Sequence, residues 1–169
     1  MIIDLIVLIP IIAALAIGLG AEGRKTALGA AGANLILGVI VIGELMRRGG
    51  EELIFETSTV ILENPKLTLG FAVDGMSGVL VLLTVIVTFC AVYISPEKAP
   101  DGRVKLYHIS PLLISAGALG AFCSTDLFFL FAFHELALIP TFLMIGIYGH
   151  GRERLAIAWK ITIYLGVGS

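Results

Sequence analysis

The sequence contains few charged residues and little cysteine. Asp, Glu, Lys and Arg make up 14% of its 169 residues, whereas a soluble domain carries about 25%. Hydrophobic residues make up 58%, and the mean hydropathy is +1.03. A soluble core of this size could not bury so much apolar surface. The composition therefore excludes an ordinary soluble domain and predicts an integral membrane protein.

Several common functional motifs are also missing. The sequence has no CxxC, HExxH, GxGxxG or P-loop spacing, so it contains no motif for a metal or a nucleotide. The net charge of −2 indicates neither nucleic acid nor an acidic partner. Cys90 and Cys123 both lie inside apolar runs, where we expect small buried hydrophobic side chains rather than a disulfide. The first residues contain Asp4 instead of the basic leader of a signal peptide, which predicts a retained first helix.

Long apolar runs predict five membrane-spanning helices and the start of a sixth. About 20 apolar residues in a helix cross a hydrocarbon core of about 30 Å, and an isolated strand could not satisfy its backbone in lipid. The predicted spans are Ile2–Leu19, Ala27–Leu45, Met76–Ile94, Ile109–Cys123, Leu127–Tyr148 and Leu155 to the end. The fourth is short, which an extension into Tyr107 and His108 or a locally thinned bilayer would explain. Pro10 is acceptable within the first span because neighbouring groups can satisfy the carbonyl that it frees.

The connections between the spans predict orientation. Three connections are rich in basic residues, and basic loops lie on the cytoplasmic side. They carry Arg24 and Lys25, then Lys98, Arg103 and Lys105, then Arg152 and Arg154. This pattern places the amino terminus outside. The connection from Met46 to Asp74 has charges of both signs, and its alternation from Leu53 to Val60 favours a short hairpin on the outer surface over an ordered coil.

The run from Asp126 to Gly149 has an acidic residue near its centre. Glu135 lies within one turn of the midpoint of its span, where insertion scales assign an ionised residue a cost of roughly 2.5–3.5 kcal/mol. A functional role is therefore the default hypothesis, and the alternative is a protonated Glu that joins helices by hydrogen bonding. Pro140 leaves the carbonyl of Leu136 without its helical donor, beside the carboxylate, where a water could bind. A harmless kink is the alternative reading of Pro140.

Two basic side chains lie in the same region of the sequence. His134 should point about 100° away from Glu135 around the helix, which favours a structural role between helices over proton relay. Lys160, in the sixth span, should differ in depth from Glu135 by roughly 12 Å, so we expect no direct salt bridge. Lys160 either snorkels to the membrane surface or joins a water-connected path to the acid. Asp74 and Asp126 are predicted helix caps, and Glu44 should pair with Arg47 and Arg48.

The segment around Glu135 reads FHELALIPT and is followed by further motifs. These are Tyr148-Gly149, Glu153-Arg154-Leu155, Tyr164 and Gly168-Ser169, while FAVDGMS precedes the third span and Ser124-Thr125-Asp126 precedes the fifth. Together they resemble subunit M (chain 4) of proton-translocating NADH–quinone oxidoreductase, respiratory complex I. The acid-Leu-X-Leu-Ile-Pro pattern is typical of antiporter-like membrane subunits, and the later motifs favour subunit M among its paralogues.

The resemblance implies an all-α bundle built from inverted halves, and we expect it in the cell's inner (plasma) membrane. It implies that Glu135 is the proton-translocating glutamate of the fifth helix, paired with a lysine on a seventh helix. Its partners would be the other membrane subunits of the complex, including antiporter-like paralogues, and lipid. NADH, flavin, iron–sulfur clusters and quinone would bind in other subunits, so no cofactor or metal is expected in this chain.

The sequence departs from the family by ending at Ser169, before a seventh helix. We therefore expect residues 1–169 to form a single membrane domain, the amino-terminal part of a longer antiporter-like subunit, from a fragment or a split gene. Two alternatives stay open. One is a subunit of a multisubunit cation/proton antiporter or of a membrane-bound hydrogenase. The other is a structural membrane piece without a proton role.

Overall fold

The computed structural model describes residues 2–49, 53–63, 66–96 and 104–168. Within these residues, five helices are long and apolar enough to cross a membrane, and a sixth follows them. The helices are α1 Ile2–Leu19, α2 Gly23–Arg47, α3 Gly75–Ile94, α4 Val104–Cys123, α5 Leu127–Leu143, a π-helical turn η1 Met144–Tyr148, and α6 Arg154–Gly168. The predicted all-α membrane architecture is confirmed. The fourth helix does extend through Tyr107 and His108, which gives it the length of a full span.

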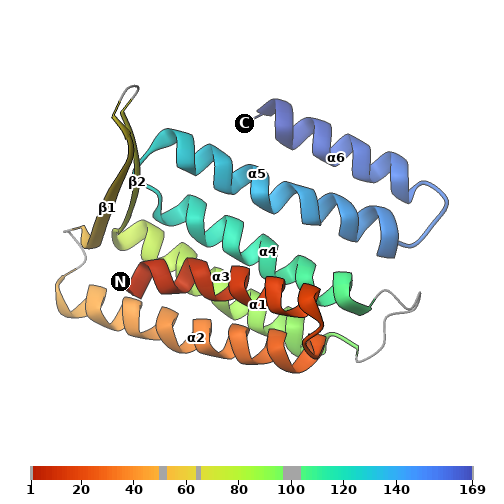
Figure 1. Cartoon of the computed structure of the whole chain (residues 1–169), viewed down its shortest axis with the longest axis horizontal. Helices are drawn as coiled ribbons and strands as arrows, with labels where there is room; N and C mark the ends of the chain where they lie inside the picture. The colour runs from red at the N-terminus through yellow and green to blue at the C-terminus, as the bar shows by residue number, and fades with distance from the viewer. Residues whose placement is uncertain (1, 50–52, 64–65, 97–103, 169) are drawn as a thin grey trace.

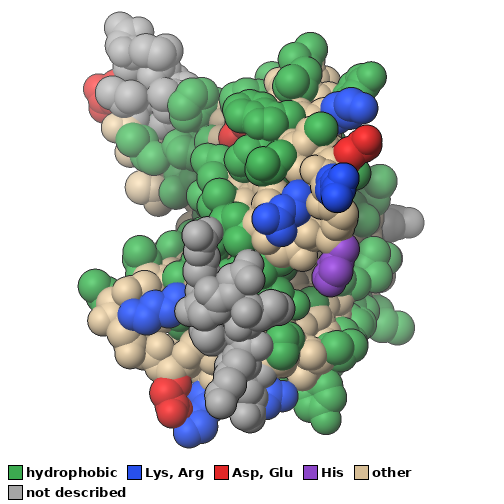
Figure 2. Space-filling view, turned by 90° about the vertical axis from the view of Figure 1, so that its right-hand side faces the viewer, with side chains coloured by type: hydrophobic (Ala, Val, Ile, Leu, Met, Phe, Trp, Pro, Cys, Tyr) green, Lys and Arg blue, Asp and Glu red, His purple; other side chains and the backbone are tan. Residues whose placement is uncertain are grey.

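The helices lie side by side with their connections at two ends of the bundle (Figure 1). The α1–α2 turn and the α5–α6 connection share one end with the last turn of α3 and the first turn of α4, and the chain's N-terminus lies at the other end with the α4–α5 turn. Figure 2 shows the first of these ends, where blue Lys and Arg side chains gather. The basic connections therefore lie together, as the charge pattern predicts. Lys98 and Arg103 lie outside the described residues.

The predicted hairpin is present and longer than expected. Strands β1 Ile54–Glu63 and β2 Lys66–Val73 pair antiparallel. Asn64 and Pro65 lie outside the described residues. The backbone of Thr125 donates to the carbonyl of Gly70 at 3.0 Å, which ties β2 to the α4–α5 turn. Asp74 then begins α3 with a capping box, and the donated hydrogen bonds of Ser77 hold the pKa of Asp74 below its usual value.

Two apolar clusters fill the interior of the first four helices. One, near the hairpin, contains Ile3, Ile6 and Leu119; the other contains Ala13, Ile17 and Leu112. The many small residues of the second cluster let the helices approach closely. Cys123 is buried as expected, but Cys90 is exposed, so that part of the prediction is wrong. Its helix turns Cys90 outward, and an apolar run alone does not distinguish a side chain that faces lipid from one that faces the core.

A buried amide compensates for the proline in α1. Pro10 has no N–H to donate to the carbonyl of Ile6 one turn earlier. The side chain of Asn34 in α2, which is 3% exposed, donates to this carbonyl at 2.9 Å. The expected compensation by a neighbouring helix is therefore confirmed at Asn34. The bond also joins α1 to α2 between the two apolar clusters.

This arrangement predicts a coupling between positions 10 and 34. Asn34→Leu removes the donor to the Ile6 carbonyl and should destabilise the bundle most when Pro10 is present. In a Pro10→Ala background the helix itself supplies an N–H, so the same substitution should cost about 0.5–1.5 kcal/mol less. The coupling is measured as a double-mutant cycle of unfolding free energies in detergent. Equal costs in both backgrounds would show that Asn34 does not act through this carbonyl.

Candidate functional site

The close approach of α4 sets the position of α5. A Cβ added at Gly117 would lie 2.6 Å from the carbonyl oxygen of Phe133 and 2.7 Å from the backbone nitrogen of Ala137. A Cβ at Gly120 would collide with the ring of Phe133. That ring also contacts Phe71 of the hairpin, with centroids 5.7 Å apart. The face of α5 that carries Phe133 and Ala137 is therefore held against both α4 and the hairpin.

Local hydrogen bonds keep α5 helical up to and beyond its proline. Asp126 caps the helix by accepting from the backbone N–H of Phe128 at 2.9 Å, as predicted. Pro140 is buried within the helix, and the hydroxyl of Thr141 donates to the carbonyl of Ala137 at 2.7 Å. The helix then widens into the π-helical turn η1, a feature that occurs often at functional sites. The guanidinium of Arg154 donates to the carbonyl of Ile147 at 3.2 Å and so closes this turn.

Glu135 lies on the side of α5 away from α4. It follows Phe133 by two residues, which places it about 200° further around the helix. It lies eight residues after Leu127, about 12 Å from the start of the span. Its side chain is 35% exposed within the chain. The mid-span carboxylate is thus fixed in depth and direction by the α4 contact, and it faces the open side of the bundle.

The side chains of His134 and Glu135 converge. Nδ1 of His134 lies 3.9 Å from Oε1 of Glu135. This nitrogen is buried and makes no hydrogen bond within the described residues. The expectation that the two side chains would diverge is wrong, because rotation about their side-chain bonds brings the polar ends together although their Cα–Cβ bonds differ by about 100°. The sequence separation of one residue gave no signal of this contact.

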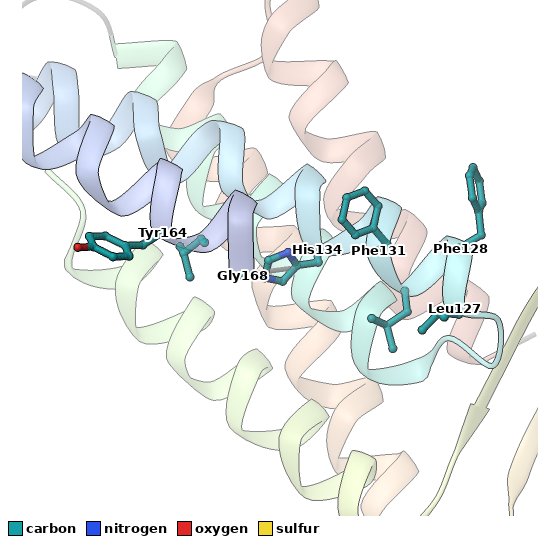
Figure 3. A pocket seen from close by; sticks show the side chains of 8 residues that line it. Leu127, Phe128, Phe131, His134, Tyr164 and Gly168 are labelled. Carbon is teal, nitrogen blue, oxygen red and sulfur yellow. The ribbon is translucent and has the colours of Figure 1, made fainter.

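The imidazole of His134 also lines a groove of about 750 Å³ between α5 and α6 (Figure 3). Most of its lining is apolar: Leu127, Phe128, Leu130 and Phe131 from α5, with Tyr164, Leu165 and Gly168 from α6. His134 therefore lies between helices, as predicted, and is one of two polar side chains in the groove, with Tyr164. The groove lies on the same open side of α5 as Glu135.

Lys160 lies elsewhere on α6. Its side chain is exposed, and within the described residues it makes no ion pair. The neighbouring Trp159 packs on Phe142, with ring centroids 5.1 Å apart. Phe142 is seven residues beyond Glu135, so Lys160 lies roughly 10 Å further along the bundle axis. The predicted depth difference, and the predicted lack of a direct salt bridge to Glu135, agree with this packing.

Other predicted charged pairs lie at the ends of the bundle. Oε1 of Glu44 lies 2.6 Å from a guanidinium nitrogen of Arg47 and 2.7 Å from Nε of Arg48, so the predicted ion pairing of Glu44 is confirmed. No group of three or more His, Cys, Asp or Glu side chains that could hold a metal occurs in the described part of the chain. The candidate functional site therefore consists of the groove between α5 and α6 and the neighbouring His134–Glu135 pair.

The chain was compared with proteins of known sequence and structure. No family model matches it. NADH-ubiquinone oxidoreductase chain 4 of Dictyostelium discoideum is 32% identical over 111 residues, 66% of this chain and 21% of that protein. NADH-quinone oxidoreductase subunit M of Rhodobacter capsulatus is 38% identical over 96 residues, 56% of this chain and 19% of that protein. The chain is similar to these subunits. It spans about a fifth of their length.

Solved structures share the fold. A chain of respiratory complex I from Thermus thermophilus aligns with 99% of this chain, with a TM-score of 0.82 and 22% identity. A chain of a membrane-bound sulfane sulfur reductase, an archaeal respiratory membrane complex, aligns with 98%, with a TM-score of 0.79 and 16% identity. This chain covers 33% and 34% of those two chains. The resemblance to subunit M and its fold class are thereby confirmed.

The α4–α5 contact can be tested at its closest point. Gly117→Ala should force the two helices apart, because its Cβ meets backbone atoms of α5 that cannot rotate away. We expect a loss of about 1–3 kcal/mol of stability or more, as for other overpacked sites. Gly43→Ala in α2 is the control, since a Cβ there meets nothing within 4 Å. The control should gain up to about 1 kcal/mol from helix propensity. Thermal unfolding in detergent measures both variants, and equal stability of the two would refute the contact.

Proposed function

We propose that this chain is part of a membrane subunit of an NADH–quinone oxidoreductase and couples electron transfer to proton translocation. The observation that carries the proposal is the similarity to subunit M. This chain also has a carboxylate in mid-span on α5. An acid at that depth is costly unless it has a role in moving charge or protons. In this proposal NADH, flavin, iron–sulfur clusters and quinone bind in other subunits. The chain lies in the plasma membrane with its amino terminus outside.

Glu135 is the proposed proton-binding group. Three features support it: the fixed depth of α5, the 35% exposure of the carboxylate on the open side of the bundle, and the imidazole nitrogen 3.9 Å away. In this proposal the Glu135 carboxyl accepts a proton and releases it during turnover.

A second candidate has the same fold. It is a subunit of a multisubunit cation/proton antiporter or of a membrane-bound hydrogenase, and the likeness to the chain of the archaeal sulfane sulfur reductase complex favours it at the level of fold. The two functions differ in their driving reaction. Proton movement driven by NADH oxidation in isolated membranes supports the first function, whereas sodium-dependent proton exchange without an electron donor supports the antiporter.

The glutamate assignment is tested by Glu135→Gln in the assembled complex. Gln is close in shape to Glu but cannot release a proton, so NADH-driven acidification of inverted membrane vesicles should fall to the background of vesicles that lack the complex. A pH-sensitive dye measures it. The matched control is Glu153→Gln, an exposed glutamate between η1 and α6, which should leave acidification unchanged. If an assembled Glu135→Gln complex acidified the vesicles fully, Glu135 would not be the proton-binding group and its role would be structural.

Lys160 is a weaker candidate for a role in proton translocation. If it connects to Glu135 through water, Lys160→Met should slow proton translocation while the complex assembles normally. Lys25→Met is the control, because Lys25 is an exposed residue that pairs with Glu22 at the end of the bundle. The rate of dye quenching per NADH oxidised measures the effect. An unchanged rate in Lys160→Met would assign Lys160 to the membrane surface.

A further inference from the structure

A second groove lies on the surface of the molecule between α1 and α4. It has a volume of about 340 Å³, and its lining is entirely apolar: Ile11, Ala14, Leu15, Gly18, Leu19, Ile109 and Leu113. The α1 residues recur at helical spacing on one face of that helix. Gly18 is an exposed residue of this lining, and a Cβ added there meets nothing within 4 Å, so a larger side chain could extend into the groove. We call this feature the α1–α4 groove.

A basic residue, Lys105, lies one turn along α4 from the lining of the α1–α4 groove. Lys105, Ile109 and Leu113 recur every four residues, so they form one stripe along α4. Lys105 is one turn beyond Ile109, toward the end of the bundle that carries the α1–α2 turn. Its side chain is exposed, and no ion pair involves it among the described residues. By contrast, Lys25 at the same end already pairs with Glu22 at 2.8 Å.

The charge beside the α1–α4 groove decides between two kinds of occupant. The groove extends about 12 Å along α1, from Ile11 to Leu19. A phospholipid offers a hydrocarbon chain with a phosphate at its end, which matches an apolar lining with a cation one turn beyond it. A second apolar helix would offer no group that pairs with Lys105.

We propose that the α1–α4 groove binds one acyl chain of an anionic phospholipid whose phosphate pairs with Lys105. The apolar lining selects for hydrocarbon but not for a headgroup, because lipid tails are as apolar as the side chains around them. The cation at its end adds the preference for a negative headgroup, and one basic residue near a membrane surface corresponds to about a fivefold preference. The site is separate from Glu135 and does not depend on the proposed proton function.

The test uses the assembled membrane complex in bilayers of phosphatidylcholine. A trace of phosphatidylglycerol or phosphatidylcholine carries a photoreactive diazirine on one acyl chain, and mass spectrometry locates the labelled peptides. We expect the peptides that contain residues 11–19 and 109–113 to be labelled about five times more by the anionic lipid. Equal labelling by both lipids, or no labelling because protein covers the groove, would overturn the proposal.

Three variants separate the two parts of the site. Gly18→Leu extends a side chain into the groove and should lower labelling by both lipids at these peptides. Lys105→Gln keeps the groove and should reduce labelling by phosphatidylglycerol to the level of phosphatidylcholine. Gly29→Leu is the control on α2, where a Cβ also meets nothing within 4 Å, and it should change neither. A preference that persists in Lys105→Gln, or labelling that persists in Gly18→Leu, would also overturn the proposal. Complex assembly is checked for each variant.

Discussion

The backbone contact between α4 and α5 is the constraint on which the candidate site depends. Gly117 admits the carbonyl of Phe133 and the backbone nitrogen of Ala137 to positions that any side chain would occupy. Because Phe133 and Ala137 face α4, the geometry of a helix turns Glu135 to the opposite side. Close packing through small residues is the usual means of helix association in lipid, where burial of apolar surface gives no driving force. One glycine therefore determines the direction of a carboxylate on another helix.

A proline in the first span imposes a second constraint, which the structure satisfies with a polar side chain. Pro10 has no N–H for the carbonyl of Ile6, and this carbonyl receives the amide of Asn34 from the neighbouring helix. A free carbonyl in hydrocarbon would cost several kcal/mol. In α5 the hydroxyl of Thr141 donates to the carbonyl of Ala137, which is not the carbonyl that Pro140 frees. The buried amide of α2 is thus part of how α1 persists as a helix.

The two open features of the molecule differ in kind. The groove between α5 and α6 has a volume of about 750 Å³ and includes His134, which lies close to Glu135. The α1–α4 groove, about 340 Å³, has no polar lining, and an exposed lysine lies one turn beyond it on α4. The first has a protonatable pair beside it, which suits movement of charge. The second suits a hydrocarbon chain with an anionic end.

The sequence alone determined the class, the number of spans and the candidate acid. Hydropathy and helix length depend on local composition, so the spans and the lengthened α4 could be predicted. Caps at Asp74 and Asp126 and the ion pair of Glu44 are local in sequence and were also predictable. Only the tertiary structure decided the approach of His134 to Glu135, the exposure of Cys90, the role of Asn34 and the groove that Ile109 and Leu113 form with α1. These features depend on side-chain rotation and on which face of each helix meets a neighbour, and neither is encoded in an apolar run.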